Sequence, residues 1–152
     1  MDAISLLKAD HKAVGDLFNE IDALSDTAHV ERGRLCAKIN QELSVHAEIE
    51  EKIFYPAFQA KTKKDTEPGD EIREAYEEHA NVKAMLAKLS ALDPAEDTFN
   101  AKLQVLGELV KHHVKEEETE LFKQARELLD ESELKALGEK MSTMKDELLA
   151  AK

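Results

Sequence analysis

The chain has 152 residues, a formal net charge of −12 and a single cysteine, Cys36. One cysteine excludes an internal disulfide and thiolate-rich metal sites and suits a reducing compartment, so we expect a cytoplasmic protein. An acidic surface disfavours DNA, RNA and anionic membranes as partners, and the sequence shows neither a signal peptide nor an apolar run long enough to cross a bilayer.

The composition favours helix throughout, with only five glycines and three prolines among many Ala, Leu, Glu and Lys. Apolar residues spaced by threes and fours predict helices over about 3–24, 29–60, 70–92, from Pro94 to about 129, and 132–149. Pro56 should kink or end the second helix, and residues 61–69 should form a loop. We expect Asp93 and Ser132 to cap the fourth and fifth helices.

Four long helices joined by short connections predict an all-α, up-down-up-down four-helix bundle over about residues 3–129. The extra C-terminal helix, about 132–149, should pack on one side or end through its apolar and methionine-rich stripe. The length suits a single domain over residues 1–152.

His46 and Glu50 lie four residues apart on the apolar face of the second helix, where unpaired polar groups are costly. His113 and Glu117 repeat this spacing in the fourth helix. In the preceding helix of each pair, His11 and His79 stand in the apolar stripe. The four-helix region thus reads as a duplicated hairpin carrying matching polar residues.

Imidazole and carboxylate groups without thiolate suit iron, manganese or zinc. Six such residues exceed one usual zinc site and predict two metal ions, each held by two histidines and bridged by both glutamates. The predicted ligands are His11, His46, Glu50, His79, His113 and Glu117.

An alternative is that each histidine is a hydrogen-bonded core residue, but one histidine per helix with glutamates at matching offsets disfavours it. His112 and His113 cannot aim at one point, and the repeat favours His113. A turn centred at Pro94 would leave His113 ~9 Å out of register with His79, unless the fourth helix begins near Glu96 or Asp97.

Acidic residues directly beside the predicted ligands should point away from them, because adjacent residues diverge on a helix. We therefore expect them to be surface charges. They are Asp10, Glu51, Glu78 and Glu118.

The segments that carry these residues resemble the hemerythrin-like HHE cation-binding family, which includes bacterial hemerythrin-like proteins. The resemblance covers about residues 3–129 and rests on Asp10-His11, His46-x-x-x-Glu50-Glu51 with Phe54-Tyr55-Pro56, Glu78-His79, and His113-x-x-x-Glu117-Glu118 with Leu121-Phe122. It implies a non-haem di-iron centre bridged by the two carboxylates and an oxo or hydroxo group. The family includes oxygen carriers, oxygen and iron sensors, and proteins that act on peroxide or nitric oxide.

The chain departs from the oxygen-carrier pattern at two places. Carriers have a second histidine one turn before the position of His79, where this chain has Ala75, and they end with a histidine and an aspartate five residues apart. The missing histidine leaves a coordination position open to water, substrate or the oxygen of Tyr55 or Tyr76. This disfavours reversible oxygen carriage and favours redox chemistry or sensing.

The leading hypothesis is that two iron ions bind O₂ or a related small oxidant. One alternative is an enzyme of oxidative-stress defence, with catalase-like turnover of H₂O₂ or reduction of NO. Another is an oxygen or iron sensor that is read by an unknown protein partner. The sequence leaves open whether the protein is an enzyme.

Overall fold

The structure is a computed structural model and describes residues 1–62 and 67–151. The structure contains two helical hairpins. In each hairpin the second arm is an α-helix that passes through one π-helical turn and continues as a further α-helix. The first hairpin contains α1 (Ala3–Asp22) and α2 (His29–Ile49), and α2 continues through the π-helix η1 (Glu50–Phe54) into α3 (Tyr55–Gln59). The second contains α4 (Glu67–Ser90) and α5 (Asp97–Glu116), and α5 continues through the π-helix η2 (Glu117–Leu121) into α6 (Phe122–Leu128).

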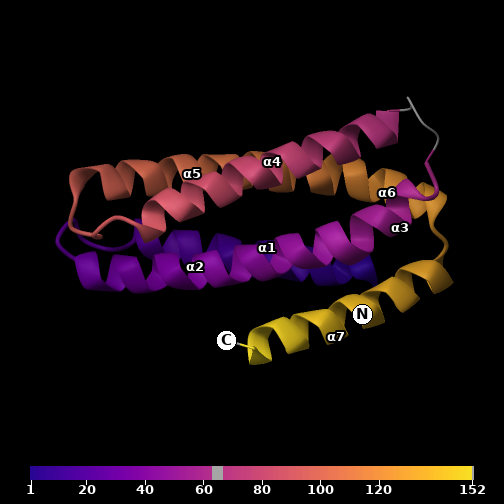
Figure 1. The fold of residues 1–152 in the computed structure, drawn as a ribbon, viewed down its shortest axis with the longest axis horizontal. Helices are drawn as coiled ribbons and strands as arrows, with labels where there is room; N and C mark the ends of the chain where they lie inside the picture. Colours follow the sequence, from indigo (N-terminus) through magenta and orange to yellow (C-terminus); the bar gives the residue numbers. More distant parts are fainter. Residues whose placement is uncertain (63–66, 152) are drawn as a thin grey trace.

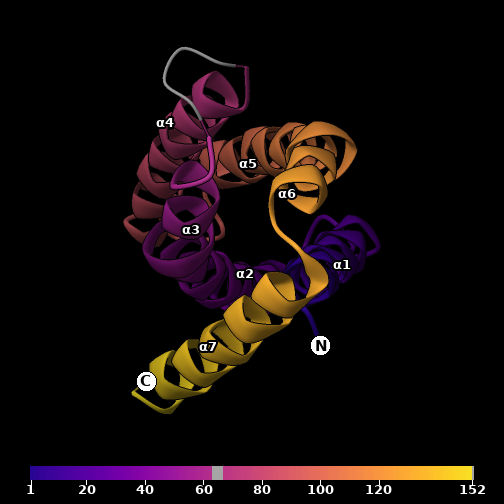
Figure 2. The ribbon, with the colours of Figure 1, turned by 90° about the vertical axis from the view of Figure 1, so that its right-hand side faces the viewer.

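The two hairpins pack into a bundle, and α7 (Glu131–Ala150) lies outside it. In Figure 1 the α1–α2 hairpin lies below the α4–α5 hairpin, and α7 runs beneath them. Figure 2 looks along the bundle and shows α7 crossing the side formed by α1 and α2. The predicted all-α bundle with an extra C-terminal helix is confirmed, and the described ranges contain no strand.

Both π-helical turns begin at the glutamate of a predicted metal-binding pair. In each turn a backbone N–H bonds to the carbonyl five residues earlier, from Tyr55 to Glu50 and from Phe122 to Glu117. Such turns are rare and gather at functional sites. The apolar spacing did not predict them, yet they repeat the internal duplication in the backbone.

Pro56 does not end the helical rod, which continues to Gln59. Proline has no N–H, so it cannot extend the five-residue pattern by bonding to the carbonyl of Glu51. The hydroxyl of Tyr76 donates to that carbonyl instead, at 3.3 Å. A tyrosine from α4 therefore satisfies the backbone group that Pro56 leaves without a partner.

Two predicted helix starts and the predicted cap of the fourth helix were wrong. α4 begins at Glu67, so Pro68 and Gly69 lie in its first turn, while residues 63–66 of the predicted loop fall outside the described residues. α5 begins at Asp97, the later start that register between His113 and His79 favoured, and Asp93 accepts the N–H of Ala95 in a turn rather than capping a helix. α7 is capped by Asp130 in a capping box with Glu133, not by Ser132.

The apolar core is divided into two clusters by a polar layer across the middle of the bundle. On α1, Leu7 belongs to one cluster and Val14 to the other, with His11 between them. On α2, Ile49 and Ile39 are divided in the same way around His46. The two apolar clusters therefore separate the polar layer from both ends of the bundle.

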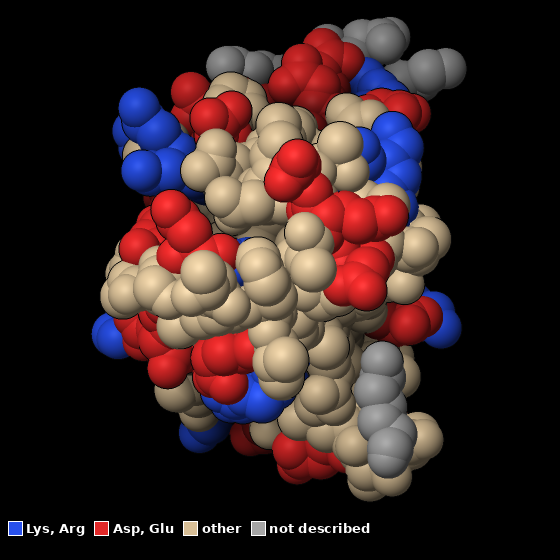
Figure 3. All heavy atoms as spheres, turned by 90° about the vertical axis from the view of Figure 1, so that its left-hand side faces the viewer, with Lys and Arg blue, Asp and Glu red and all other residues tan. Residues whose placement is uncertain are grey.

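Acidic side chains outnumber basic ones, 33 to 21 over the whole sequence. The end of the molecule drawn in Figure 3 shows acidic groups over much of the face and basic groups mainly at its edges. Among the described residues, no helix combines the length and the apolar character needed to span a membrane.

Candidate metal centre

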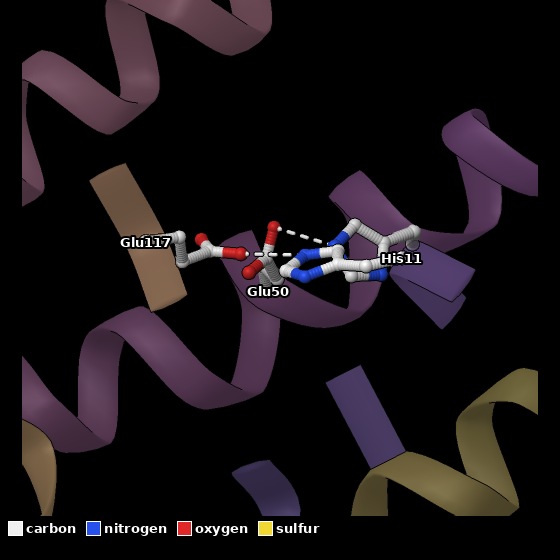
Figure 4. A group of neighbouring side chains, drawn as sticks. His11, Glu50 and Glu117 are labelled. Atoms are coloured by element: carbon white, nitrogen blue, oxygen red, sulfur yellow. Dashed lines mark ion pairs between the residues drawn. The ribbon is translucent and has the colours of Figure 1, made fainter. Parts of the chain in front are cut away.

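Six polar side chains meet in the layer between the two apolar clusters. Each is at most 9 % exposed, and the two glutamates are the most deeply buried, at 0 % and 1 %. In Figure 4, His11 from α1, Glu50 from η1 and Glu117 from η2 point toward one another. The six residues are the ones that the sequence proposed: His11, His46, Glu50, His79, His113 and Glu117.

Every histidine presents Nε2 to a glutamate carboxylate. The distances to Glu50 Oε1 are 3.1 Å from both His46 and His79. Those to Glu117 are 2.9 Å from His11 to Oε1 and 3.4 Å from His113 to Oε2. Each glutamate therefore lies between a histidine of the first hairpin and one of the second, as a bridging group must.

The donor atoms fall into two groups that share Glu50. Within each group the atoms lie within 4.8 Å of one another, close enough to surround one cation. One group is His11, His46, Glu50 and Glu117, and the other is Glu50, His79 and His113. Glu117 also reaches the second group through its Oε2, which lies 3.4 Å from His113 Nε2, so both glutamates lie between the two groups.

Several donor atoms at the centre of the cluster are buried yet make no hydrogen bond. Native proteins rarely leave buried polar atoms without a partner. These atoms are His11 Nε2, His46 Nε2, Glu117 Oε1 and both carboxylate oxygens of Glu50. Since they converge from four segments of the chain, a cation between them is the ligand that they fit.

The acidic residues beside the predicted ligands are not surface charges, so that prediction was wrong. Each accepts a hydrogen bond from Nδ1 of a histidine on another helix: Asp10 from His46 at 2.9 Å, Glu78 from His113 at 2.6 Å, Glu118 from His11 at 2.6 Å and Glu51 from His79 at 3.2 Å. Adjacent residues do diverge, but the divergence aims each carboxylate at a neighbouring helix. Such partners fix the tautomer and ring orientation of a ligand histidine.

These hydrogen bonds follow the internal duplication, and they connect side chains both within each hairpin and between the two hairpins. Asp10 and Glu78 each bind the second histidine of their own hairpin. Glu51 and Glu118 each bind the first histidine of the opposite hairpin. The imidazole rings are therefore held by both hairpins together, so the site depends on how the hairpins pack.

The electrostatics of the cluster favour charged groups in spite of burial. Burial alone would lower the pKa of His113, but the carboxylates of Glu117 and Glu78, which accept hydrogen bonds from its ring, raise it to about 10. Burial opposes the charge of Glu117, yet the neighbouring imidazoles of His11 and His113 hold its pKa well below the usual range. The cluster thus holds protons that a metal ion must displace.

Tyr55 and Phe122 occupy equivalent positions, five residues after the two central glutamates. A π-turn takes about five residues, so both side chains turn toward the cluster although a regular α-helix would direct them aside. The hydroxyl of Tyr55 donates to Glu117 Oε2 and lies 3.5 Å from His79 Nε2. Phe122 stacks on His11 with ring centroids 5.8 Å apart. The two donor groups therefore differ: one has a phenol beside it and the other a phenyl ring.

A cavity of about 40 Å³ lies against all four histidines of the cluster. Its remaining wall is mainly aliphatic and includes Val14, Leu43, Val82, Leu86, Val110 and Val114. A site of this size accepts a water molecule or a diatomic molecule, and its walls favour an uncharged one.

Comparison with known proteins places the chain in a family. Residues 2–125 match the profile of the Hemerythrin HHE cation binding domain. The chain belongs to this family. The HHE domain has a His/Glu cluster able to bind metal cations, as the geometry above indicates.

Two relatives extend this comparison. The HHE domain is similar to a crystal structure of a hemerythrin HHE cation binding domain-containing protein from Mycobacterium kansasii, with 26% identity, a TM-score of 0.84 and coverage of 99% of this chain and 89% of that chain. It is 29% identical over 122 residues to a DNA nickase of Nostoc sp. (strain PCC 7120), covering 80% of this chain. The match spans 33% of the length of that nickase.

The remaining residues weighed for the HHE site lie away from its centre. His112 is exposed, with 64% of its side chain accessible, whereas His113 faces the cluster. The hydroxyl of Tyr76 donates a hydrogen bond to the backbone carbonyl of Glu51. Ala75 is buried in the apolar cluster that also contains Tyr55. Tyr55 is therefore the side-chain oxygen that approaches the position left by the missing histidine.

Proposed function

We propose that this HHE domain holds two iron ions and binds O₂ or a related small oxidant beside them. The observation that carries the proposal is the pair of histidine groups around Glu50 and Glu117, in which five buried donor atoms make no hydrogen bond. An iron pair, when bound, supplies electrons for the reduction of a small oxidant.

Each protein group has a distinct part in this proposal. His11 and His46 would hold one ion, His79 and His113 the other, and the two glutamates would bridge them. Four acidic residues hold the imidazole rings in the required tautomer. The cavity against the histidines has a size that suits a small molecule, and its mainly aliphatic remaining wall favours an uncharged one.

The oxidant-binding proposal is tested by metal analysis and absorption spectroscopy of protein produced with iron available. We expect about two irons per chain, near-ultraviolet bands in the oxidised form, and a spectral change when O₂ is added to the reduced form. Glu50→Ala should lose most of the metal, while Glu48→Ala, a change two residues away on the exposed side, should retain it. Stoichiometric zinc that iron does not replace would overturn the assignment of the metal.

Turnover of peroxide is a second candidate, favoured by the hydroxyl of Tyr55. This group holds a proton toward Glu117 beside the cluster, where reduction of an oxidant requires protons. Release of O₂ from H₂O₂ by the iron-loaded protein, slowed in Tyr55→Phe, would support catalase-like activity. Bleaching in proportion to protein without turnover would count against it.

DNA cleavage is not part of the proposal. The relative named as a nickase matches this chain over a third of its own length. A net charge of −12 repels the phosphate backbone of a nucleic acid. We propose instead that the partner is a small molecule and that the protein works in the cytoplasm.

A further inference from the structure

The outer helix α7 reaches the metal cluster through a chain of charged contacts. Lys145 Nζ lies 2.6 Å from Asp10 Oδ1, and Asp10 Oδ2 accepts from His46 Nδ1 at 2.9 Å. The other nitrogen of His46 faces Glu50. Three side chains therefore connect α7, which lies beyond the residues matched by the family profile, to the centre of the site.

Asp10 depends on both of its partners because its side chain is only 4 % exposed. A buried carboxylate is costly unless each oxygen is paired. One oxygen is paired with His46 and the other with Lys145, whose side chain is 29% exposed. Removing the lysine charge leaves a buried anion with a single partner.

The equivalent contacts around the cluster show what is special about Lys145. Glu51, which holds His79, is paired with Lys83 of α4 at 2.9 Å. Glu78, the counterpart of Asp10, lies 3.6 Å from His112 of α5. Both of these partners belong to the four-helix bundle. Of the lysines paired with the four acidic residues in the described ranges, Lys145 is the one that comes from outside the bundle.

The packing of α7 brings Lys145 to this position. Leu134 and Met141 of α7 are buried in the apolar cluster next to the metal site. Between them, Gly138 crosses the start of α1 so closely that an added Cβ would lie 2.3 Å from the carbonyl oxygen of Met1. A larger residue at this crossing would push α7 away from α1, and Lys145 away from Asp10.

We propose that α7 positions the metal centre: Lys145 holds Asp10, Asp10 holds the ring of His46, and metal loading and docking of α7 therefore strengthen each other. The inference rests on the proposed binding of metal by this cluster. A cation at Nε2 of His46 requires the proton to stay on Nδ1, which keeps the bond to Asp10. Because linkage is reciprocal, whatever anchors α7 also favours the metal-bound form.

Metal release measures one direction of this linkage. We expect a chelator to remove metal from iron-loaded Lys145→Met about tenfold faster than from the wild type. This is the low end of the range for removing a residue that supports a ligand histidine. Lys145→Arg should restore slow release. Lys140→Met, at an exposed position of the same helix, is the matched control and should behave as wild type.

Hydrogen exchange measures the other direction and is independent of activity. Metal loading should increase protection of the α7 amides in the wild type, and this increase should be lost in Lys145→Met. Gly138→Leu, which keeps the lysine at position 145 but displaces α7 and so moves Lys145 away from Asp10, should give the same two losses.

The outcomes separate the inference from the proposed function. Wild type that takes up no iron would overturn both. Wild type that takes up two irons, together with a Lys145→Met variant that releases them at the wild-type rate and keeps metal-dependent protection of α7, would overturn the inference alone.

Discussion

The hydroxyl of Tyr55 donates a hydrogen bond to Oε2 of Glu117, and so joins the end of one hairpin to the π-turn of the other. Both side chains are almost completely buried. Burial and the negative charge of Glu117 raise the pKa of Tyr55 well above that of a free tyrosine, so the phenol keeps its proton in the metal-free protein. We predict that a cation that neutralises the glutamates removes their part of this effect and makes the oxygen of Tyr55 available as a ligand.

We predict that Tyr55→Phe removes a phenolate-to-iron absorption band from the oxidised, iron-loaded protein. It should also weaken the binding of one of the two ions about tenfold. The ring is retained, and Phe122 shows that a phenyl group fits at the equivalent position, so the fold should persist.

Tyr76→Phe is the control for this substitution, because the hydroxyl of Tyr76 bonds to a backbone carbonyl and not to the cluster. An unchanged visible spectrum and unchanged metal affinity in Tyr55→Phe would reject Tyr55 as a ligand.

Glu118→Gln tests the hydrogen bond that orients His11. The amide is close in size to the carboxylate but carries no charge, so it holds the protonated Nδ1 of His11 less strongly. We expect metal affinity to fall by about 10- to 100-fold, the range for partners of ligand histidines. Competition with a chromophoric chelator measures the change. Glu120→Gln, two residues further along and exposed, should leave the affinity as it is; equal affinities in the two variants would contradict the role given to Glu118.

The metal-free protein should lose stability as the solution becomes alkaline. His113 has a folded-state pKa of about 10 against 6.5 for the free side chain, so its charge stabilises the fold fully below about pH 6.5. That contribution disappears as the pH rises toward 10. The pKa of His46 is also raised, because the charge of Glu50 and the bond to Asp10 outweigh its burial. Urea unfolding of the metal-free protein should therefore give a lower free energy of unfolding at pH 9.5 than at pH 6.5.

At the acid end the sign is opposite, because the pKa of Glu117 is lowered in the folded state. The stability that Glu117 contributes is present above about pH 4.5 and is lost as the pH falls.

The variant His113→Gln tests the alkaline prediction, because it should reduce the loss of stability between pH 6.5 and 9.5. A free energy of unfolding that stays level or rises from pH 6.5 to 9.5 in the metal-free wild type would show that the cluster is not charged in this way.

Filling the cavity beside the histidines should slow the reaction with small oxidants. Val14 lines the cavity and is buried, so Val14→Leu places an extra methylene in a space of about 40 Å³. We expect the rate of oxidation of the reduced, iron-loaded protein by O₂ to fall several-fold in stopped-flow measurements. Overpacking should cost about 1–3 kcal/mol of stability without loss of metal.

Val105→Leu makes the same chemical change at an exposed position of α5, where the side chain is 44% accessible. It should leave the oxidation rate unchanged. Equal rates in Val14→Leu and the wild type would show that the small molecule does not pass through or occupy this cavity.

The pattern of residues along the chain was sufficient for the fold class and for the arrangement of the polar layer. Apolar spacing of three and four determines which face of each helix is buried, and a histidine on that face must lie in the core. Because His46–Glu50 and His113–Glu117 repeat one spacing in two similar hairpins, the sequence predicted that the six side chains meet in the core. Whether they bind iron stays a prediction.

The tertiary structure decided what surrounds those six residues. Local geometry shows that Asp10 diverges from His11, but only packing shows that it then meets His46 and Lys145. The π-turns that bring Tyr55 and Phe122 toward the cluster depend on one extra residue per turn, which a regular helical period does not reveal. Side-chain periodicity is a property of a single helix. The partners of the histidines, and the link to α7, arise from contacts between helices, so only the assembled bundle shows them.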